Sequence, residues 1–545
     1  MGFMAWISSF ISSQWNRLLL LSSAAFGDTA FWAYPQSTID HSHFNFKEFL
    51  THPAHLWSVN TTISFPGSPG FDDATARWTI FSPPTYNAAI RPGSEADIAR
   101  VIKLASLYKF PFLTRGAGHG YSIALSDFQN GLALDLSQWK SLEIDQTAET
   151  VTIGPGVTIS EVFDPLYEAG FQIRKSNVHE TLKLNDLADN SWCSTESGTC
   201  GCPSLVGVTL GGGAGRYQGI HGLVIDALVS VRMVTAAGDL IEVSKESYPD
   251  LFWAIRGAGA NFGVITSATY KVNRLVNQGN FLHADFYFSA EKSYDYFKII
   301  EKLNYKFPAN IATIVLINYN ASTKSIQVGG NWVYFGPEKE GMKALQPVFD
   351  LGPISSVVSV VPYKKLLATT GGGYDTLVCQ GHTNRDLYSL NQKTYSASGW
   401  QKGFDKMAKF FEEYPGGRNS ALVFEVFPNQ ATLAVASDET AYPWREARGY
   451  IIGHFIWADG DTATATASNK VGLELRDELL LTSGYNEVSV FVNYARGDEG
   501  LESIYGRDKL PRLVELKKTW DPNNIFAYNN YPLPLEYPSK QRDEL

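Results

Sequence analysis

A glycine-rich loop at residues 115–122 is the strongest candidate for chemistry in this sequence. It reads Arg115-Gly-Ala-Gly-His-Gly-Tyr-Ser122 and follows a short strand-like run at 112–114. Successive backbone N–H groups in such a loop form a concavity that binds anions, and glycine lets the chain approach a pyrophosphate closely. The loop therefore predicts a site for a cofactor that contains a diphosphate.

Two further glycine clusters lie downstream of this loop. One places seven glycines in the sixteen residues 207–222, and the other reads Arg256-Gly-Ala-Gly-Ala-Asn-Phe-Gly263. None of the three has the G-x-G-x-x-G pattern followed by an acidic residue, so a Rossmann nicotinamide site is disfavoured, and the P-loop lysine is missing. A single cluster would be read as a set of turns, whereas three in one region favour a cofactor site.

Helices and strands alternate around these loops from about residue 78 to residue 272. Ser94 can cap a helix that Pro111 stops, and Thr158 with Glu161 forms a capping-box pattern that opens a second helix. Strands are predicted at 112–114, 132–136 and 150–153, and a hairpin at 228–235 and 240–243. This organisation is typical of an α+β domain.

Length and composition indicate more than one folded unit. The 545 residues exceed what one hydrophobic core usually serves, and 44% apolar, 13% aromatic and 18% charged residues argue against disorder. From about 273 to 492 glycine clusters thin out while aromatics persist, which predicts a second domain with an amphipathic helix at 400–413. A basic helical stretch, 509–518, follows it.

Charge and cysteine content narrow the class of partner. The formal net charge is −10 without a prominent Lys/Arg run, and the isoelectric point is about 5.6, so nucleic acid is disfavoured and a small-molecule partner is favoured. The four cysteines are too few and too irregular for a disulfide framework or a zinc site, and no metal is expected. They are Cys193, Cys200, Cys202 and Cys379.

The two ends of the chain bear on its compartment. The apolar run 18–26 follows Arg17 and resembles a weak signal peptide that is too short to span a bilayer; a buried or disordered segment is the alternative. Asn60 and Asn320 begin glycosylation sequons. The last four residues, 542–545, read Arg-Asp-Glu-Leu, close to an endoplasmic-reticulum retrieval signal but equally compatible with an ordinary charged tail. We expect the secretory pathway, with a cytoplasmic location as the alternative.

The order of the motifs along the chain resembles the FAD-linked oxidases of the berberine-bridge-enzyme-like family, and among these the fungal members. The resemblance covers residues 78–534. Its motifs are R-G-A-G-H-G, C-x-C, L-G-G-G-x-G-R, D-L-F-W-A-I-R-G-A-G-x-N-F-G-V-I-T, T-A-Y-P-W-R, V-N-Y-A-R-G-D-E and W-D-P-N-N-x-F.

The resemblance implies an α+β fold of the p-cresol-methylhydroxylase and vanillyl-alcohol-oxidase type. An FAD-binding domain of two subdomains would occupy residues 78–272, and an α+β substrate domain with an antiparallel sheet would occupy 273–492. Residues 493–535 would return to the FAD domain, and residues 1–30 would be a signal or disordered segment. We expect a monomer without a membrane span.

The resemblance also assigns the cofactor contacts. It implies a covalent bond from His119 to the flavin 8α carbon, and in bicovalent members a thioether from a cysteine to C6, which counting eleven residues back from Gly211 places at Cys200. A free or disulfide-bonded thiol is the alternative for Cys200. The implied FAD-binding residues are Arg115, Gly116, Ala117, Gly118, His119, Gly120, Ser122, Cys200, Gly207, Gly212, Gly263, Val264 and Asn530.

Tyr494 matches the tyrosine that acts as the base in several members of the family. A tyrosine at its reference pKa near 10 is a poor base at neutral pH, so positive charge or hydrogen bonding must assist it. Arg496 is close in sequence, and its side chain would share a face with Tyr494 only in an extended segment. The alternative is that Tyr494 merely lines a pocket or the core.

The implied activity is oxidation of a small organic molecule, in particular a fungal secondary metabolite, by hydride transfer to flavin with O₂ as the acceptor. Alcohol oxidation, dehydrogenation and oxidative cyclisation all fit. The alternatives are a carbohydrate or oligosaccharide oxidase of the same fold and a non-redox cyclase or binding module. Two departures from the family pattern are a surplus segment at 175–197 and Pro203, where the family often has a small branched residue that governs oxygen access.

Overall fold

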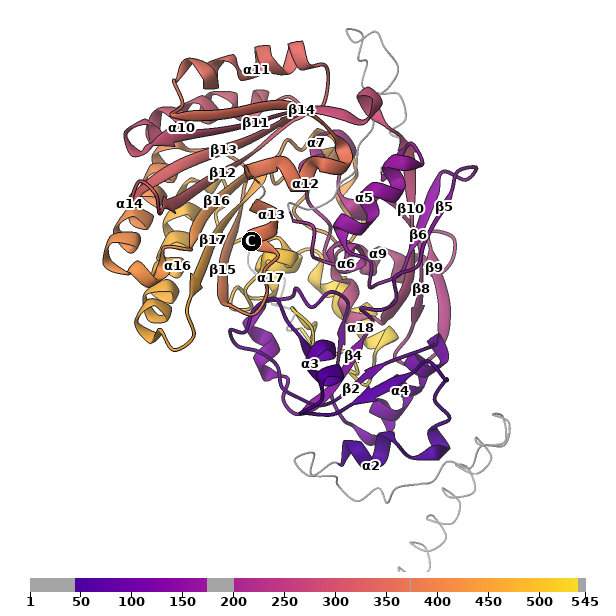
Figure 1. The fold of residues 1–545 in the computed structure, drawn as a ribbon. Helices are drawn as coiled ribbons and strands as arrows, with labels where there is room; N and C mark the ends of the chain where they lie inside the picture. The colour runs from indigo at the N-terminus through magenta and orange to yellow at the C-terminus, as the bar shows by residue number, and fades with distance from the viewer. Residues whose placement is uncertain (1–44, 174–199, 373, 538–545) are drawn as a thin grey trace, which may run out of the picture.

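The computed structural model of the protein describes residues 45–173, 200–372 and 374–537. These residues form three sheets with their covering helices (Figure 1). The possible signal segment, the 175–197 segment with Cys193, and the Arg-Asp-Glu-Leu end lie outside the described residues. No helix in the described part of the chain is both long and apolar enough to cross a membrane.

The first sheet carries the 115–122 loop at the end of one of its strands. Its order is β1 (Thr62–Ser64), β2 (Tyr86–Arg91), β4 (Gly131–Asp135) and β3 (Phe112–Arg115), with β2, β4 and β3 parallel. Helix α4 (Glu95–Tyr108) begins as expected, because the Ser94 side chain accepts a hydrogen bond from the Asp97 N–H. The apolar stripe of α4 packs with β4 in one buried cluster. Helices α2 (Phe46–Leu50) and α3 (Pro69–Thr75) lie at this end of the molecule.

The second sheet is antiparallel and holds the other two glycine clusters near its covering helices. Its order is β5 (Leu142–Asp145), β6 (Thr150–Ile153), β10 (Val264–Arg274), β8 (Leu228–Val234) and β9 (Leu240–Ser244), and β7 (Phe171–Ile173) also pairs with β10. Helices α5 (Ile159–Glu168), α6 (Leu205–Leu210) and α9 (Pro249–Ala258) lie between it and the third sheet (Figure 1). The predicted capping box is present, since the Thr158 N–H donates to Glu161 at 2.8 Å.

The third sheet, which we call the large sheet, has seven antiparallel strands. Their order is β14 (Ser355–Pro362), β11 (Asn280–Ser289), β13 (Ser325–Tyr334), β12 (Ile311–Asn320), β16 (Ala421–Val426), β17 (Gly449–Trp457) and β15 (Asn384–Gln392). Helices α10 (Ser293–Leu303), α11 (Glu338–Asp350), α14 (Ala397–Glu413) and α16 (Thr462–Ser483) cover its outer face (Figure 1). Many aromatics of this region, Trp332 and Trp400 among them, fill the core under these helices and not a pocket.

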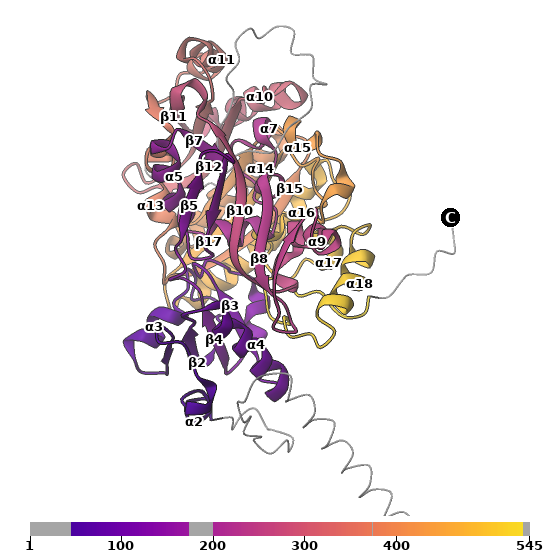
Figure 2. The ribbon, with the colours of Figure 1, turned by 90° about the vertical axis from the view of Figure 1, so that its right-hand side faces the viewer.

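The C-terminal segment packs back onto the N-terminal part of the chain. Helix α18 (Leu510–Trp520) contacts α9, and both lie near α17 (Leu501–Tyr505) (Figure 2). Buried Lys517 pairs with Asp521 at 2.7 Å and donates to the carbonyl of Asn261 at 3.0 Å. Asp521 in turn accepts the N–H groups of residues 525 and 526, which fixes the turn after the helix.

Short helices lie in the connections between strands of the second sheet and of the large sheet. They are α7 (Gln218–His221), α8 (Val224–Ala227), α12 (Leu366–Thr369), α13 (Tyr374–Val378) and α15 (Gln430–Leu433). Helices α7 and α15 contact each other, and α12 and α13 follow β14. The chain therefore brings loops from all three sheets to one central region.

Candidate active site

A cavity of about 440 Å³ lies in this central region. The 115–122 loop, the segment at 200–216, the turn at 257–265, strands of the large sheet and the segments at 491–494 and 526–531 all contribute to its lining. All the site residues named from the sequence line it except Ser122 and Gly212. The three glycine clusters and the C-terminal tail thus meet at one site.

Close packing explains why the 115–122 loop is rich in glycine. A side chain at Gly116 would place its Cβ 2.8 Å from the carbonyl oxygen of Pro155, and Gly118 has φ +71°, a conformation that favours glycine. A Cβ at Gly120 would come within 2.8 Å of the Asn530 side chain. The loop therefore presents bare backbone to the cavity, as a diphosphate site requires.

Arg115 and Ser122, at the two ends of this loop, have structural partners. Arg115 Nη1 contacts Asp135 Oδ1 at 2.8 Å, which ties the end of β3 to β4. Ser122 Oγ donates to the backbone oxygen of Asn530 at 2.9 Å and so holds the C-terminal tail against the loop. Gly212 also lies behind the cavity wall, where a Cβ would meet the ring of Tyr442 at 2.7 Å.

His119 is half-buried in the cavity lining and has a free ring nitrogen. Its imidazole stacks on Trp78 with ring centroids 4.3 Å apart, and Nε2 has no hydrogen-bond partner among the described residues. Burial and the nearby Arg385 charge lower the pKa of His119 to about 3. The imidazole is therefore neutral at physiological pH, the state in which a ring nitrogen is nucleophilic.

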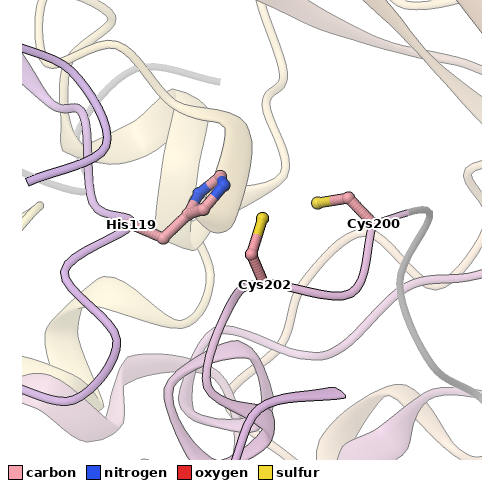
Figure 3. Close-up of side chains that lie close together, drawn as sticks. All are labelled: His119, Cys200 and Cys202. Atoms are coloured by element: carbon pink, nitrogen blue, oxygen red, sulfur yellow. The ribbon is translucent and has the colours of Figure 1, made fainter. Parts of the chain in front are cut away.

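Two cysteines lie beside His119, and Figure 3 shows their side chains directed toward the same point. Ligand atoms of His119, Cys200 and Cys202 lie within 4.8 Å of one another. Cys202 is joined to Cys379 by a disulfide with its Cα atoms 5.6 Å apart, so its sulfur is not available as a thiolate ligand. Cys200 is a free thiol that lines the cavity, and burial raises its pKa.

The disulfide is a feature that the sequence did not reveal. The spacing argued only against a disulfide framework, and the bridged residues are 177 positions apart. The bridge links the segment before α6 to the segment after α13. Asp375 reinforces this connection, because its carboxylate accepts the Gly201 N–H at 2.7 Å. Both contacts hold the Cys200 region against loops that belong to the large sheet.

Tyr494 lies in the cavity and is paired with a carboxylate. Its hydroxyl donates to Oε1 of Glu425, a residue on β16 that is 1% exposed, at 3.2 Å. The ring packs edge-on against Phe491 and Tyr450, with centroids 5.0 and 5.7 Å away. Sequence reasoning missed Glu425, although a lone acid within the apolar strand Ala421–Val426 is a signal that could have found it.

Arg496 does not assist Tyr494. Residues 492–494 form a 3-10 turn, so the segment is not extended and the two side chains diverge. Arg496 Nε contacts Asp386 Oδ1 at 2.9 Å, and its guanidinium lies over the ring of Tyr388 at 4.5 Å. The Tyr494 hydroxyl therefore donates to an acid, while Arg496 pairs with the carboxylate of Asp386.

Other polar residues of the lining were also missed from the sequence. They are Arg77, Arg216, Asp285, Asn331 and His454. Burial, with Arg385 and His119 nearby, lowers the pKa of His454 to about 3. The large sheet also contributes aliphatic side chains to the lining, namely Ile314, Leu316, Leu387, Val423 and Ile452.

Comparison with known proteins identifies the fold and the family. Residues 86–181 match the family described as FAD binding domain, and residues 490–530 match berberine and berberine like. Solved structures with the same fold include a BBE-like protein of Physcomitrella patens (TM-score 0.72, 19% identity, covering 88% of this chain and 98% of that one). Another is 6-hydroxy-D-nicotine oxidase of Arthrobacter nicotinovorans (TM-score 0.72, 20% identity, covering 88% of this chain and 99% of that one).

Curated relatives are more similar in sequence. The FAD-linked oxidoreductase fogF of Aspergillus ruber is 42% identical, covering 90% of this chain and 95% of its own. The FAD-linked oxidoreductase srdI of Neurospora crassa is 41% identical, covering 88% of this chain and 91% of its own. The bare-backbone loop, the free imidazole nitrogen and the central cavity fit the cofactor these names imply. The chain is an FAD-linked oxidoreductase of the berberine-bridge-enzyme-like family.

Proposed function

We propose that the protein oxidises a small organic molecule that carries an alcohol or an activated C–H bond. The observation that carries this proposal is the single cavity that joins the 115–122 loop to the Tyr494–Glu425 pair. FAD, when bound, supplies a hydride acceptor at N5 and passes the electrons to O₂, giving hydrogen peroxide. Residues 78–272 and 493–535 would hold the cofactor, and residues 273–492 would shape the substrate pocket.

Tyr494 and Glu425 would take the proton that leaves the substrate. The tyrosine hydroxyl already donates to the Glu425 carboxylate, so a substrate proton received on the tyrosine oxygen is matched by transfer of its own proton to Oε1. The pair would act as one proton acceptor, with Tyr494 toward the substrate. This arrangement removes the need for a tyrosinate stabilised by a nearby cation.

His119 and Cys200 would anchor the cofactor covalently. A neutral imidazole with a free Nε2 and a thiol beside it in the same lining provide the two side chains that such bonds need, the thiol after loss of its proton. Acid-precipitated wild-type protein should stay yellow, and mass spectrometry of a digest should show the mass of flavin on the peptide with His119. The variants His119→Ala and Cys200→Ser separate the two bonds. A colourless precipitate from a flavin-replete preparation would refute both.

The aliphatic lining favours a lipophilic substrate, such as a secondary metabolite, over an oligosaccharide. Sugar sites need many hydrogen-bonding side chains, whereas Ile314, Leu316 and Val423 give the wall beside Glu425 an aliphatic part. Peroxide release with benzyl and cinnamyl alcohols, compared with cellobiose and xylobiose, tests this choice. Turnover of the sugars alone would overturn it. Flavin that stays oxidised under anaerobic conditions with every turned-over compound would instead favour a non-redox role.

We also propose that the protein enters the secretory pathway. The Cys202–Cys379 disulfide is of a kind that persists in oxidising compartments, and Asn60 is exposed and accessible to glycosylation. Expression in a fungal host should give a protein whose mass falls on deglycosylation, and Asn60→Gln should abolish part of that shift. Retention of a fluorescent fusion in the cytosol, with Asn60 unmodified, would contradict the proposal.

A further inference from the structure

Arg216 is a buried cation that belongs neither to the Tyr494–Glu425 pair nor to the 115–122 loop. It lies between α6 and α7, lines the cavity and is 3% exposed. Its Nε and Nη1 have no hydrogen-bond partner among the described residues. Burying a guanidinium without partners is costly, and native proteins keep such groups where a ligand completes them.

The protein's own acids do not neutralise Arg216. Among the described residues Arg216 forms no ion pair, although Glu425 and Asp285 are near enough to act on it electrostatically. Glu425 accepts the Tyr494 hydroxyl. Asp285 is bound by His283 at 3.1 Å and by the N–H groups of Gly371 and Gly372 at 3.2 and 3.0 Å. Burial lowers the pKa of Arg216 to about 10, so it remains a cation at neutral pH.

The location of Arg216 favours a contact with the substrate over a contact with the diphosphate of the cofactor. Glu425 and Asp285, the two acids whose charges act on it, lie on β16 and β11 of the large sheet. The glycine loop, by contrast, packs against Pro155, Ser204 and Asn530, none of which lies on these strands. The guanidinium is therefore near the part of the lining that holds Glu425, the partner of the Tyr494 hydroxyl.

We propose that Arg216 binds an anionic oxygen of the substrate, a carboxylate, phenolate or enolate, while the carbon to be oxidised lies at the Tyr494–Glu425 pair. The planar donor fork of arginine suits such an oxygen, and the aliphatic wall suits the rest of the molecule. The substrate class is thus a lipophilic organic acid or acidic phenol. This inference rests on the proposed function only for the position of the reacting carbon.

Calorimetric titration with benzoate and with benzamide tests the anion site. Benzamide has nearly the same shape but no charge, so the ratio of the two affinities reports the cation alone. The wild type should bind benzoate at least tenfold more tightly than benzamide. Arg216→Met should lose that preference and bind benzamide as before, and Arg216→Lys should retain part of it. Arg418→Met, which removes an arginine outside the cavity lining, should behave as the wild type.

Flavin content, read from the ratio of visible to protein absorbance, separates the possible failures. Unchanged flavin with a lost benzoate preference supports the proposal. Loss of flavin in Arg216→Met with the benzoate preference kept would overturn it and assign Arg216 to the cofactor. Equal binding of benzoate by the wild type and Arg216→Met would also overturn it. Because binding is measured without turnover, failure to oxidise any alcohol would count against the proposed function and not against the anion site.

Discussion

Replacing Tyr494 by Phe removes one hydroxyl from the cavity and leaves the ring contacts with Phe491 and Tyr450 in place. A positioned general base contributes about 10²–10⁴-fold to a rate, and each tenfold corresponds to about 1.4 kcal/mol, so the barrier to flavin reduction should rise by about 3–5 kcal/mol. The lost hydrogen bond to the Glu425 carboxylate should cost about 1–3 kcal/mol of folding stability. The kinetic effect therefore exceeds the structural one.

The assay is anaerobic stopped-flow bleaching of the flavin by an alcohol that gives peroxide with the wild type. Glu425→Gln is the matched variant, because the amide keeps the shape of the carboxylate but is a far weaker proton acceptor. Each single variant should slow reduction by a similar factor. The double variant should be hardly slower than either, since the two residues act as a unit. Unchanged reduction by Tyr494→Phe, or losses that multiply in the double variant, would refute the paired proton acceptor.

Three further predictions concern stability. Lys517→Met breaks a fully buried ion pair with Asp521 and should lower the free energy of unfolding by about 3–5 kcal/mol, measured by urea denaturation; a cost below 1 kcal/mol would contradict it. Cys379→Ala removes the bridge to Cys202 and should cost about 2–5 kcal/mol, an effect that a reducing agent reproduces in the wild type only. Burial holds the pKa of His454 at about 3, against 6.5 in the unfolded chain. Below pH 6.5 the unfolded chain binds the extra proton, so this histidine lowers the free energy of unfolding by about 1.4 kcal/mol per pH unit toward pH 3. His454→Gln should make the fall in stability shallower by that amount and leave the contribution of His119.

Local elements of the fold could be predicted from the sequence because each depends on neighbouring residues. The helix capped by Ser94, the strand at 150–153 and the hairpin at 228–235 and 240–243 correspond to α4, β6, and β8 with β9. Periodicity and capping are properties of short segments, so they survive without knowledge of the tertiary fold.

The site could be predicted where its residues lie in recognisable motifs, as the 115–122 loop and Tyr494 do. Glu425 lies in a strand that only the tertiary fold brings to the cavity, and nothing in its motif gave Arg216 a role. The sequence left open whether Arg496 lies beside Tyr494, for a related reason. Residues that are two positions apart in sequence can have different partners. The guanidinium of Arg496 forms an ion pair with the buried carboxylate of Asp386. The spacing of two residues in the sequence does not determine which distant residues their side chains contact in the fold.

The contacts between α18 and the N-terminal part of the chain also set an order of assembly during synthesis. The second sheet and α9 leave the ribosome well before Lys517, which donates to the carbonyl of Asn261, has been made. Until then the surface that α18 covers stays open, while the whole large sheet is translated in between. A nascent chain stalled before residue 510 should therefore keep this surface exposed and remain a client of chaperones.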